Sequence, residues 1–222
     1  MSRYPQPEGR RGSLKWIQRA VNRQPALLDA AILPALGKAR SISWLSPLAG
    51  DDFAEYRDVA FLERLGLAEL QAPLREFWPR HGPQWDALAR SDEGDVLLIE
   101  AKAHVDELCS PGTGAGAPSR AKIDRAFASV AAAAGAKPKA PWCDVFYQLG
   151  NRLAHLHFLR THGVAAWLVL VNFTGNTDMK GPHSRAEWEA AYRIALHVMG
   201  ISERSPPLRH VVRAYPDVST LA

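Results

Sequence analysis

The chain of 222 residues has little cysteine and no long apolar stretch. Its two cysteines, Cys109 and Cys143, do not form a CxxC motif, which argues against a structural zinc site or a disulfide framework and fits a reducing compartment. No apolar run approaches the roughly 20 residues that cross a membrane, and the opening residues, MSRYPQPEGRRG, lack the apolar core of a signal peptide. These absences predict a cytoplasmic protein without a membrane partner.

The chain also has only a small excess of positive over negative charge. Lysine and arginine together number 27, and aspartate and glutamate 23, which gives a formal net charge of +4. This small excess permits a polyanionic partner but does not require one, because part of it lies in residues 1–12. That stretch is rich in Pro, Gly and Arg and shows no periodicity. We therefore expect a flexible tail over residues 1–12 and a single domain over residues 13–222.

Several well-known catalytic and nucleotide-binding motifs are missing. The chain has neither the GxSxG turn of the α/β-hydrolases nor the glycine-rich turn that binds dinucleotides. The glycines within residues 109–120 are spaced like those of a phosphate-binding loop, but the Gly-Lys-Ser/Thr sequence that opens the helix of a P-loop is absent. The site must therefore be sought elsewhere.

Apolar periodicity and capping residues predict both helices and strands. The predicted helices cover residues 13–23, 25–36, 51–66, 121–135, 144–162 and 184–200. The predicted strands cover residues 74–78, 85–90, 95–104, 165–173 and, at an edge, 211–215, whereas residues 41–50 fit either a strand or a loop. The order helix, three strands, helix, strand predicts an α/β three-layer sandwich, in which helices flank a central mixed β-sheet and extra helices lie at both ends.

The stretch over residues 82–104 places charged residues next to a buried strand. Its residues VLLI are apolar on both faces, which predicts a central strand that is covered on both sides. Glu100, Lys102 and His104 follow this apolar run. Their side chains are expected on the same face of the strand, because strand side chains repeat every two residues. Asp86 lies on the preceding strand of the same predicted hairpin. A charged pair at the end of a central strand needs a compensating role, because burying a charge is unfavourable.

A second set of acids falls in the predicted helix over residues 51–66. On a helical wheel, Glu55 and Asp58 lie inside the apolar stripe that includes Phe61 and Leu62. Two interpretations remain open. The acids lie at the margin of the stripe and reach water or an arginine, or Glu55 points into a site formed by the strands.

Asp86, followed after a short hairpin by Glu100, Ala101 and Lys102, resembles the motif of the PD-(D/E)XK nuclease superfamily. This superfamily includes restriction endonucleases, Holliday-junction resolvases and RecB-type exonucleases. The resemblance covers residues 51–173. It implies the αβββαβ core of the restriction-endonuclease-like fold and metal-dependent cleavage of nucleic acid.

The resemblance also implies accessory residues. The family often adds an acid on the helix before the sheet, which would be Glu55, and RecB-like members add a glutamine on the following helix, which would be Gln148. A tyrosine usually follows that glutamine by one turn, whereas Tyr147 precedes it here. Trp85 stands where the name-giving proline of the family would be. For His104, contact with the phosphate, proton transfer and a surface role all remain open.

Two carboxylates and a lysine brought together across a hairpin are the parts of a divalent-metal phosphodiesterase site. Asp86, Glu100 and the backbone carbonyl of Ala101 would hold Mg²⁺, which prefers octahedral oxygen coordination, or Mn²⁺ in its place. Glu55 would bind a water molecule or a second metal ion. Lys102 would hold the attacking water or stabilise the negative charge that develops on the phosphate.

These residues predict a metal-dependent nuclease that acts on DNA, with RNA left open as a substrate. Many members of the superfamily cut duplexes as dimers, so the resemblance also implies a homodimer. The alternative is a module of the same fold that binds nucleic acid or a protein partner without turnover. A Glu-x-Lys pattern also occurs by chance on surface strands, where the two side chains simply pair. No motif in the chain supports an α/β enzyme of another chemistry.

Overall fold

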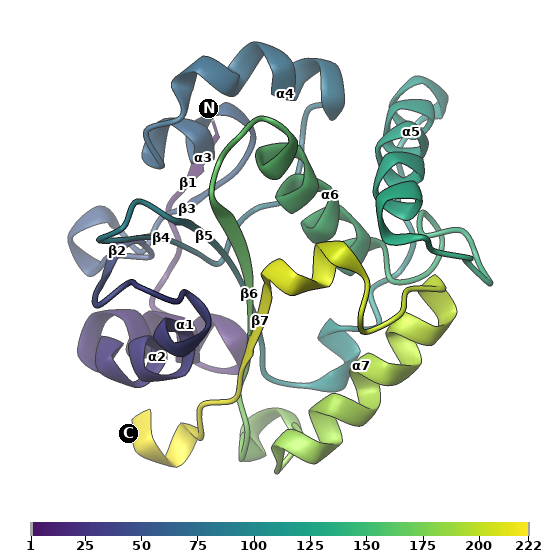
Figure 1. Cartoon of the computed structure of the whole chain (residues 1–222). Coiled ribbons are helices and arrows are strands. Elements are labelled where there is room, and N and C mark those ends of the chain that lie inside the picture. Colours follow the sequence, from purple (N-terminus) through teal and green to yellow (C-terminus); the bar gives the residue numbers. More distant parts are fainter. Residues whose placement is uncertain (1, 222) are drawn as a thin grey trace.

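The computed structural model of the chain describes residues 2–221 and is built around a five-stranded sheet (Figure 1). The strands lie in the order β2-β4-β5-β6-β7. Their bounds are Ile42–Ser46 for β2, Ala87–Ser91 for β4, Val96–Lys102 for β5, Ala166–Asn172 for β6 and Val211–Ala214 for β7. The pairs β2–β4 and β4–β5 are antiparallel, whereas β5–β6 and β6–β7 are parallel. The protein is therefore an α/β protein with a mixed sheet.

β5 is the central strand, and every one of its residues is buried. Its apolar side chains point alternately into two hydrophobic cores, with Leu97 and Ile99 in one and Val96 and Leu98 in the other. A strand that is covered on both faces is apolar without interruption. The prediction of a central strand from the sequence VLLI is thus confirmed.

Helices cover both faces of the sheet (Figure 1). On the side of Leu97 and Ile99 lie α1 (Gly12–Arg23) and α2 (Pro25–Ile32). The other side is covered by α3 (Asp58–Arg64), α4 (Gln71–Phe77), α5 (Ala117–Ala134), α6 (Tyr147–Thr161) and α7 (Arg185–Met199). This arrangement is compatible with the predicted three-layer sandwich.

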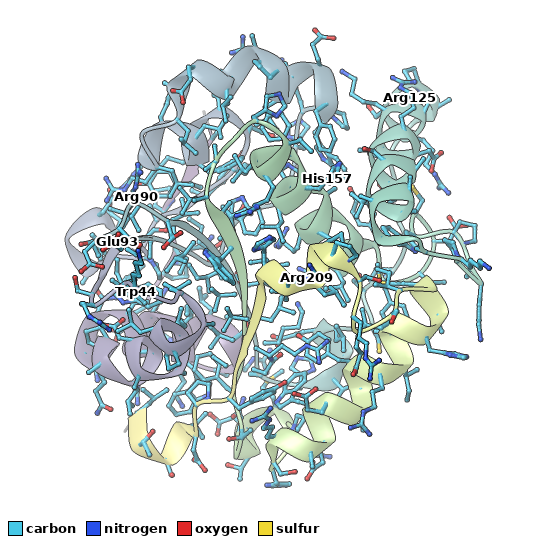
Figure 2. The ribbon with its side chains drawn as sticks, viewed as in Figure 1. Trp44, Arg90, Glu93, Arg125, His157 and Arg209 are labelled. Atoms are coloured by element: carbon cyan, nitrogen blue, oxygen red, sulfur yellow. The ribbon has the colours of Figure 1, made fainter. Side chains whose placement is uncertain are left out.

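Short 3-10 segments and loops connect these elements. The 3-10 segments are η1 (Leu33–Ala35), η2 (Ala49–Asp51), η3 (Ala68–Leu70), η4 (Val105–Glu107), η5 (Thr177–Met179), η6 (Pro206–His210) and η7 (Val218–Leu221). Figure 2 shows the side chains on this frame, with Arg90 on β4, Glu93 in the turn between β4 and β5, and Arg125 on α5. Between residues 2 and 221, no helix is both long and apolar enough to cross a membrane.

Within residues 1–12, for which a flexible tail is predicted, Arg3 and Tyr4 form a short strand. β1 (Arg3–Tyr4) pairs with β3 (Glu55–Tyr56) in a second, two-stranded antiparallel sheet. The guanidinium of Arg3 donates hydrogen bonds of 2.8–3.1 Å to the side chain and backbone oxygens of Asp51. These partners lie 48 residues away, so local composition carries no signal of these contacts.

The helix predicted over residues 51–66 is also shorter than expected. It begins only at Asp58, as α3, and β3 precedes it. The carboxylate of Asp51, the first residue of the predicted helix, binds Arg3. The predicted position of Glu55 on a helix was therefore wrong, because this residue lies on β3.

The strand predicted over residues 74–78 was wrong, because this stretch belongs mostly to α4. Leu70, Leu74 and Phe77 repeat at intervals of three and four residues, which is a helical spacing. The proline of this helix lies in its first turn, where a missing backbone N–H is tolerated. The third antiparallel strand of the sheet is β2, within the stretch over residues 41–50 that had been left open.

Predictions that depended on local signals are confirmed. The helix predicted over residues 184–200 is α7. Ser184 caps it, because its Oγ accepts a hydrogen bond from the backbone amide of Glu187 and donates one to the Glu187 carboxylate. The buried strand predicted over residues 165–173 is β6, and the predicted edge strand is β7. The helices predicted from residues 121 and 144 are α5 and α6, with their starts shifted by a few residues.

Candidate functional site

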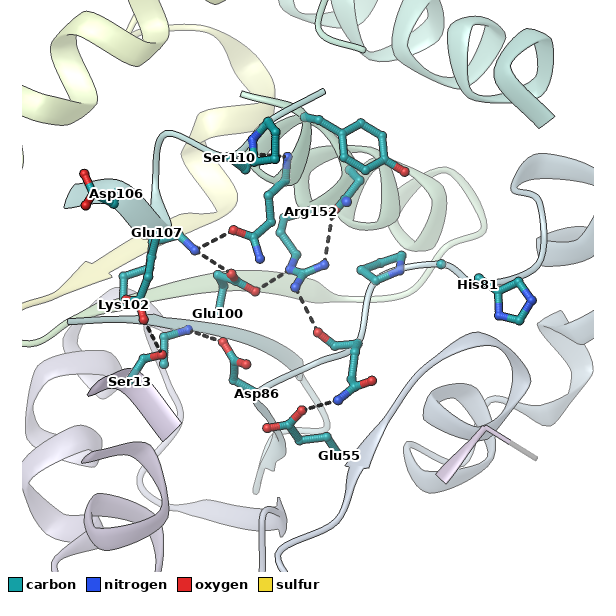
Figure 3. Close-up of a pocket in the computed structure, with 18 of the residues that line it drawn as sticks. Ser13, Glu55, His81, Asp86, Glu100, Lys102, Asp106, Glu107, Ser110 and Arg152 are labelled. Atoms are coloured by element: carbon teal, nitrogen blue, oxygen red, sulfur yellow. Dashed lines mark hydrogen bonds and ion pairs between the residues drawn. The ribbon is translucent and has the colours of Figure 1, made fainter. Parts of the chain in front are cut away.

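A cavity of about 620 Å³ lies where β5 ends, beside the segment that precedes β4 (Figure 3). Its walls come from β3, the segment before β4, the end of β5, the loop that follows β5, and the first turns of α6. Among the residues that line it are Glu55, Gln84, Asp86, Glu100, Lys102, Gln148 and Arg152. Most of the residues singled out from the sequence therefore meet in one hollow.

Asp86 and Glu100 lie next to each other in the wall of this cavity. β4 and β5 are antiparallel with Ala87 opposite Ile99, so one further step along each chain brings Asp86 beside Glu100. Facing residues in such a pair have Cβ atoms about 5 Å apart. The backbone amide of Ala101 donates a 2.7 Å hydrogen bond to Asp86 Oδ2, which holds the acid against β5. The structure thus brings these two predicted acids together.

Lys102, the last residue of β5, is on the same face as Glu100 and is 4% exposed. Its ammonium donates hydrogen bonds of 2.7 Å to Glu100 Oε1 and to Gln148 Oε1. Gln148 lies in the first turn of α6, and its backbone amide donates a 3.0 Å hydrogen bond to Ser110 Oγ. The predicted accessory glutamine is therefore in direct contact with the predicted lysine.

Arg152 is a member of the site that the sequence analysis did not select. It is 3% exposed, and its Nε donates a 2.5 Å hydrogen bond to Glu100 Oε2. Its Nη2 donates a 2.8 Å hydrogen bond to the backbone oxygen of Gln84, and its guanidinium lies 4.8 Å from the centre of the Trp85 ring. The available signal was its spacing of one helical turn from Gln148, which puts both side chains on the same helix face.

Glu55 reaches the cavity from β3. Its Oε2 accepts hydrogen bonds from Gln84 Nε2 at 2.5 Å and from Gln6 Nε2 at 3.2 Å. This position agrees with the second interpretation, in which Glu55 points into a site formed by the strands. Asp58 has a different role, because its Oδ1 accepts a 2.8 Å hydrogen bond from the backbone amide of Gly82.

Asp86, Glu55 and Glu100, which all line the cavity, have unequal electrostatic surroundings. Burial raises the pKa of Asp86 well above its usual value, and the charges of Glu100 and Glu55 raise it further. Burial also raises the pKa of Glu55 to about 7. Burial acts in the same direction on Glu100, but the adjacent charges of Arg152 and Lys102 outweigh it and hold the pKa of Glu100 below its usual value. Glu100 is therefore the firmly ionised acid of the three.

Replacing Glu55 by Gln should stabilise the protein at alkaline pH. An acid whose pKa rises on folding contributes stability that is complete below its usual pKa of 4.5 and is lost as the pH rises through about 7. At about pH 8, ionised Glu55 should lower the free energy of unfolding by about 3 kcal/mol relative to the Glu55→Gln variant, whose new amide oxygen can still accept from Gln84. Urea unfolding of both proteins at about pH 4 and pH 8 measures the difference, and a gap that does not change with pH would contradict it.

His104 lies outside this cavity. β5 ends at Lys102, so the strand alternation that would place His104 beside Lys102 does not continue. The Nε2 of His104 is 3.6 Å from Glu107 Oε1, and the residue lines a neighbouring hollow together with Lys180. The prediction that His104 shares the face of Lys102 was therefore wrong.

Two carboxylates and one carbonyl suit a hard cation such as Mg²⁺. Asp86 Oδ1 accepts no hydrogen bond from the described residues. The carbonyl of Ala101 points toward the β4 side, as its amide does, because both groups of one strand residue face the same neighbouring strand. Within residues 2–221, no three His, Cys, Asp or Glu side chains gather in a group that could hold a metal ion. Glu55, Asp86 and Glu100 therefore do not form such a three-carboxylate group in this structure.

No family model, curated protein or solved structure matches this chain. The functional assignment consequently depends on the geometry and chemistry of the cavity itself.

Proposed function

We propose that the protein is a metal-dependent phosphodiester hydrolase, a nuclease that acts on DNA. The observation that carries this proposal is the meeting of Asp86, Glu100 and Lys102 in one cavity at the open end of the β4–β5 hairpin. Two of these charged side chains, Glu100 and Lys102, are almost completely buried. Buried charges are typical of functional sites, because a structural core avoids their desolvation cost, and the raised pKa of Asp86 and the lowered pKa of Glu100 fit such a site.

The order of the elements supports a core that resembles the PD-(D/E)XK superfamily. Helices α1 and α2 precede the antiparallel set β2, β4 and β5, and α6 leads into β6, which is parallel to β5. This order resembles αβββαβ, with α3 and α4 inserted between the first and second strands. β2 takes the part that the sequence analysis had given to residues 74–78.

Mg²⁺, or Mn²⁺, would be held by the carboxylates of Asp86 and Glu100 and by the backbone carbonyl oxygen of Ala101. When bound, the ion supplies positive charge that makes a water molecule a better nucleophile and offsets the negative charge of the phosphate.

Lys102 supplies a fixed positive charge next to these ligands. Two of its three N–H groups are bonded to Glu100 and Gln148, so one remains for a phosphate oxygen or a water molecule in the cavity. A donor that is already oriented stabilises charge that develops during the reaction. Gln148 acts through Lys102, whose direction it fixes, and Glu55, with a pKa of about 7, can exchange a proton with a water molecule near neutral pH.

DNA is the proposed substrate because its phosphodiester suits these groups and the chain carries a net charge of +4. RNA stays an alternative substrate of the same chemistry. Assembly as a homodimer and a cytoplasmic location remain expectations from the resemblance and the composition.

Cleavage of supercoiled plasmid and of single-stranded DNA tests the proposal. We expect nicked or degraded products with Mg²⁺ or Mn²⁺ and none with a chelator. Lys102→Met should cleave at least about a hundredfold more slowly, because one oriented charge or donor at the reacting phosphate contributes roughly 10²–10³ in rate. Lys137→Met, at an exposed lysine in the loop after α5, is a matched control and should cleave like wild type. The proposal is refuted if wild type cleaves neither DNA with either metal ion.

A second candidate function is binding of nucleic acid without turnover. One observation favours it: both oxygens of Glu100 are already paired, one with Lys102 and the other with Arg152. A carboxylate neutralised in this way does not need a metal ion for stability. Retarded migration of DNA in a gel, without cleavage under any metal condition, would support this function instead.

A further inference from the structure

Arg152 connects separate parts of the candidate site (Figure 3). From α6 it reaches Glu100 on β5 through Nε, and the backbone oxygen of Gln84, before β4, through Nη2. Its Nη1 donates a 2.9 Å hydrogen bond to Asn151 Oδ1, and its guanidinium lies over the ring of Trp85. These contacts fix the guanidinium in one place, so its charge is a permanent part of the cavity.

The charges around the cavity are divided unevenly. Glu55, Asp86, Glu100, Asp106 and Glu107 line it and can bring five negative charges, whereas Lys102 and Arg152 bring two positive ones. Both cations contact the same acid, because Lys102 binds Glu100 Oε1 and Arg152 binds Glu100 Oε2. A divalent ion that uses Glu100 as a ligand therefore meets positive charge already in contact with that carboxylate.

We propose that Arg152 is the resident counter-cation of the metal site, which neutralises Glu100 while no metal is bound and competes with the metal ion for that carboxylate. This inference rests on the proposed function, because it concerns the ion that the nuclease site would use. It assigns to Arg152 a role in setting metal affinity, in addition to its role in holding Glu100 and the Gln84 segment in position.

The direction in which metal affinity changes when the charge of Arg152 is removed distinguishes this role from a purely structural one. Like charges repel strongly where bulk water is excluded, so a cation bonded to a ligand weakens the binding of a second cation to it. Removing the charge of Arg152 should therefore tighten metal binding. If Arg152 only maintained the shape of the site, its loss would distort Glu100 and weaken metal binding.

Calorimetric titration of Mn²⁺ into the full chain, without DNA, measures this sign. Arg152→Gln keeps an N–H donor for Glu100 but removes the charge, and we expect it to bind Mn²⁺ at least about tenfold more tightly than wild type. Arg152→Lys keeps the charge and should bind Mn²⁺ within about threefold of wild type. Arg160→Gln removes an exposed charge from the same helix, so it is the matched control and should leave the affinity unchanged.

Thermal unfolding with and without Mn²⁺ gives a second readout. Without the ion, Arg152→Gln should melt at a lower temperature than wild type, because Glu100 has lost a charged partner. Mn²⁺ should then raise its melting temperature more than it raises that of wild type, because an ion that binds only the folded state stabilises it. If this variant is unfolded without metal, Mn²⁺ should restore the fold, and failure to do so would overturn the inference.

The outcomes also separate this inference from the proposed function. Wild-type binding of Mn²⁺ together with unchanged or weaker binding by Arg152→Gln would overturn the counter-cation role and leave the nuclease proposal standing. No binding of Mn²⁺ to wild type or to any variant would contradict the metal site itself, and both proposals would fail together.

Discussion

Asp86→Asn should slow metal-dependent DNA cleavage by at least about 10³-fold, which corresponds to about 4 kcal/mol, because it removes a charged metal ligand. The fold should be as stable as that of wild type, or more stable. The side-chain oxygen of asparagine can still accept the hydrogen bond from the amide of Ala101. The substitution also removes a carboxylate whose pKa is raised by burial and by the charges of Glu100 and Glu55, so an unfavourable charge disappears. Lost activity would then not result from unfolding.

Initial rates of plasmid cleavage and urea unfolding, measured on the same samples, test both parts of this prediction. Asp92→Asn is the matched control, because it makes the same chemical change at an exposed position in the turn of the same hairpin. It should keep the wild-type rate. Cleavage by Asp86→Asn within about tenfold of wild type would exclude Asp86 as a metal ligand, and marked destabilisation would contradict the electrostatic argument.

The free energy of unfolding of the wild-type protein should fall between about pH 7.5 and pH 3.5. In His155→Phe this fall should be smaller by about 4 kcal/mol. His155 is 1% exposed, and its ring lies among those of Phe61, Trp78 and Trp85. Burial lowers the pKa of His155 to about 3, whereas in the unfolded chain the pKa is near 6.5. The stability that the neutral imidazole contributes is therefore complete above about pH 6.5 and is lost as the pH falls toward 3.

Phenylalanine has a similar size and no titrating group, so this variant should have a shallower dependence of unfolding free energy on pH. The measured quantity is the change between the two pH values, which is independent of any constant cost of the substitution at neutral pH. His183→Ala removes an exposed histidine and should keep the wild-type slope. Equal slopes for wild type and His155→Phe would contradict the argument, because they would show that the pKa of His155 does not differ between the folded and unfolded states.

Some of this structure could be predicted because the signals are local. The continuous apolar sequence of β5 specifies a strand that is covered on both faces, and its charged end, Glu100 and Lys102, therefore had to be explained. The predicted hairpin put Asp86 and Glu100 on neighbouring strands, and the register of β4 and β5 places them side by side. Ser184 and Glu187 marked the start of α7 by the same kind of local chemistry.

The remainder depends on contacts between distant parts of the chain. Glu55 was selected as an acid in an apolar stripe, but its strand forms because residues 3 and 4 pair with it, and a wheel over residues 51–66 cannot contain that information. Arg152 was missed because its significance arises from Glu100, which is 52 residues away. The reactive residues of the hairpin could thus be predicted from local sequence, whereas the positions of Glu55 and Arg152 beside them depend on tertiary contacts.

The pairing of β1 with β3 has a practical consequence for work with the purified protein. A shortened chain that starts at residue 13, as the predicted domain boundary would suggest, loses both the Tyr4–Glu55 strand pair and the Gln6 amide that binds Glu55. Recombinant protein for the assays above should therefore keep residues 3–6.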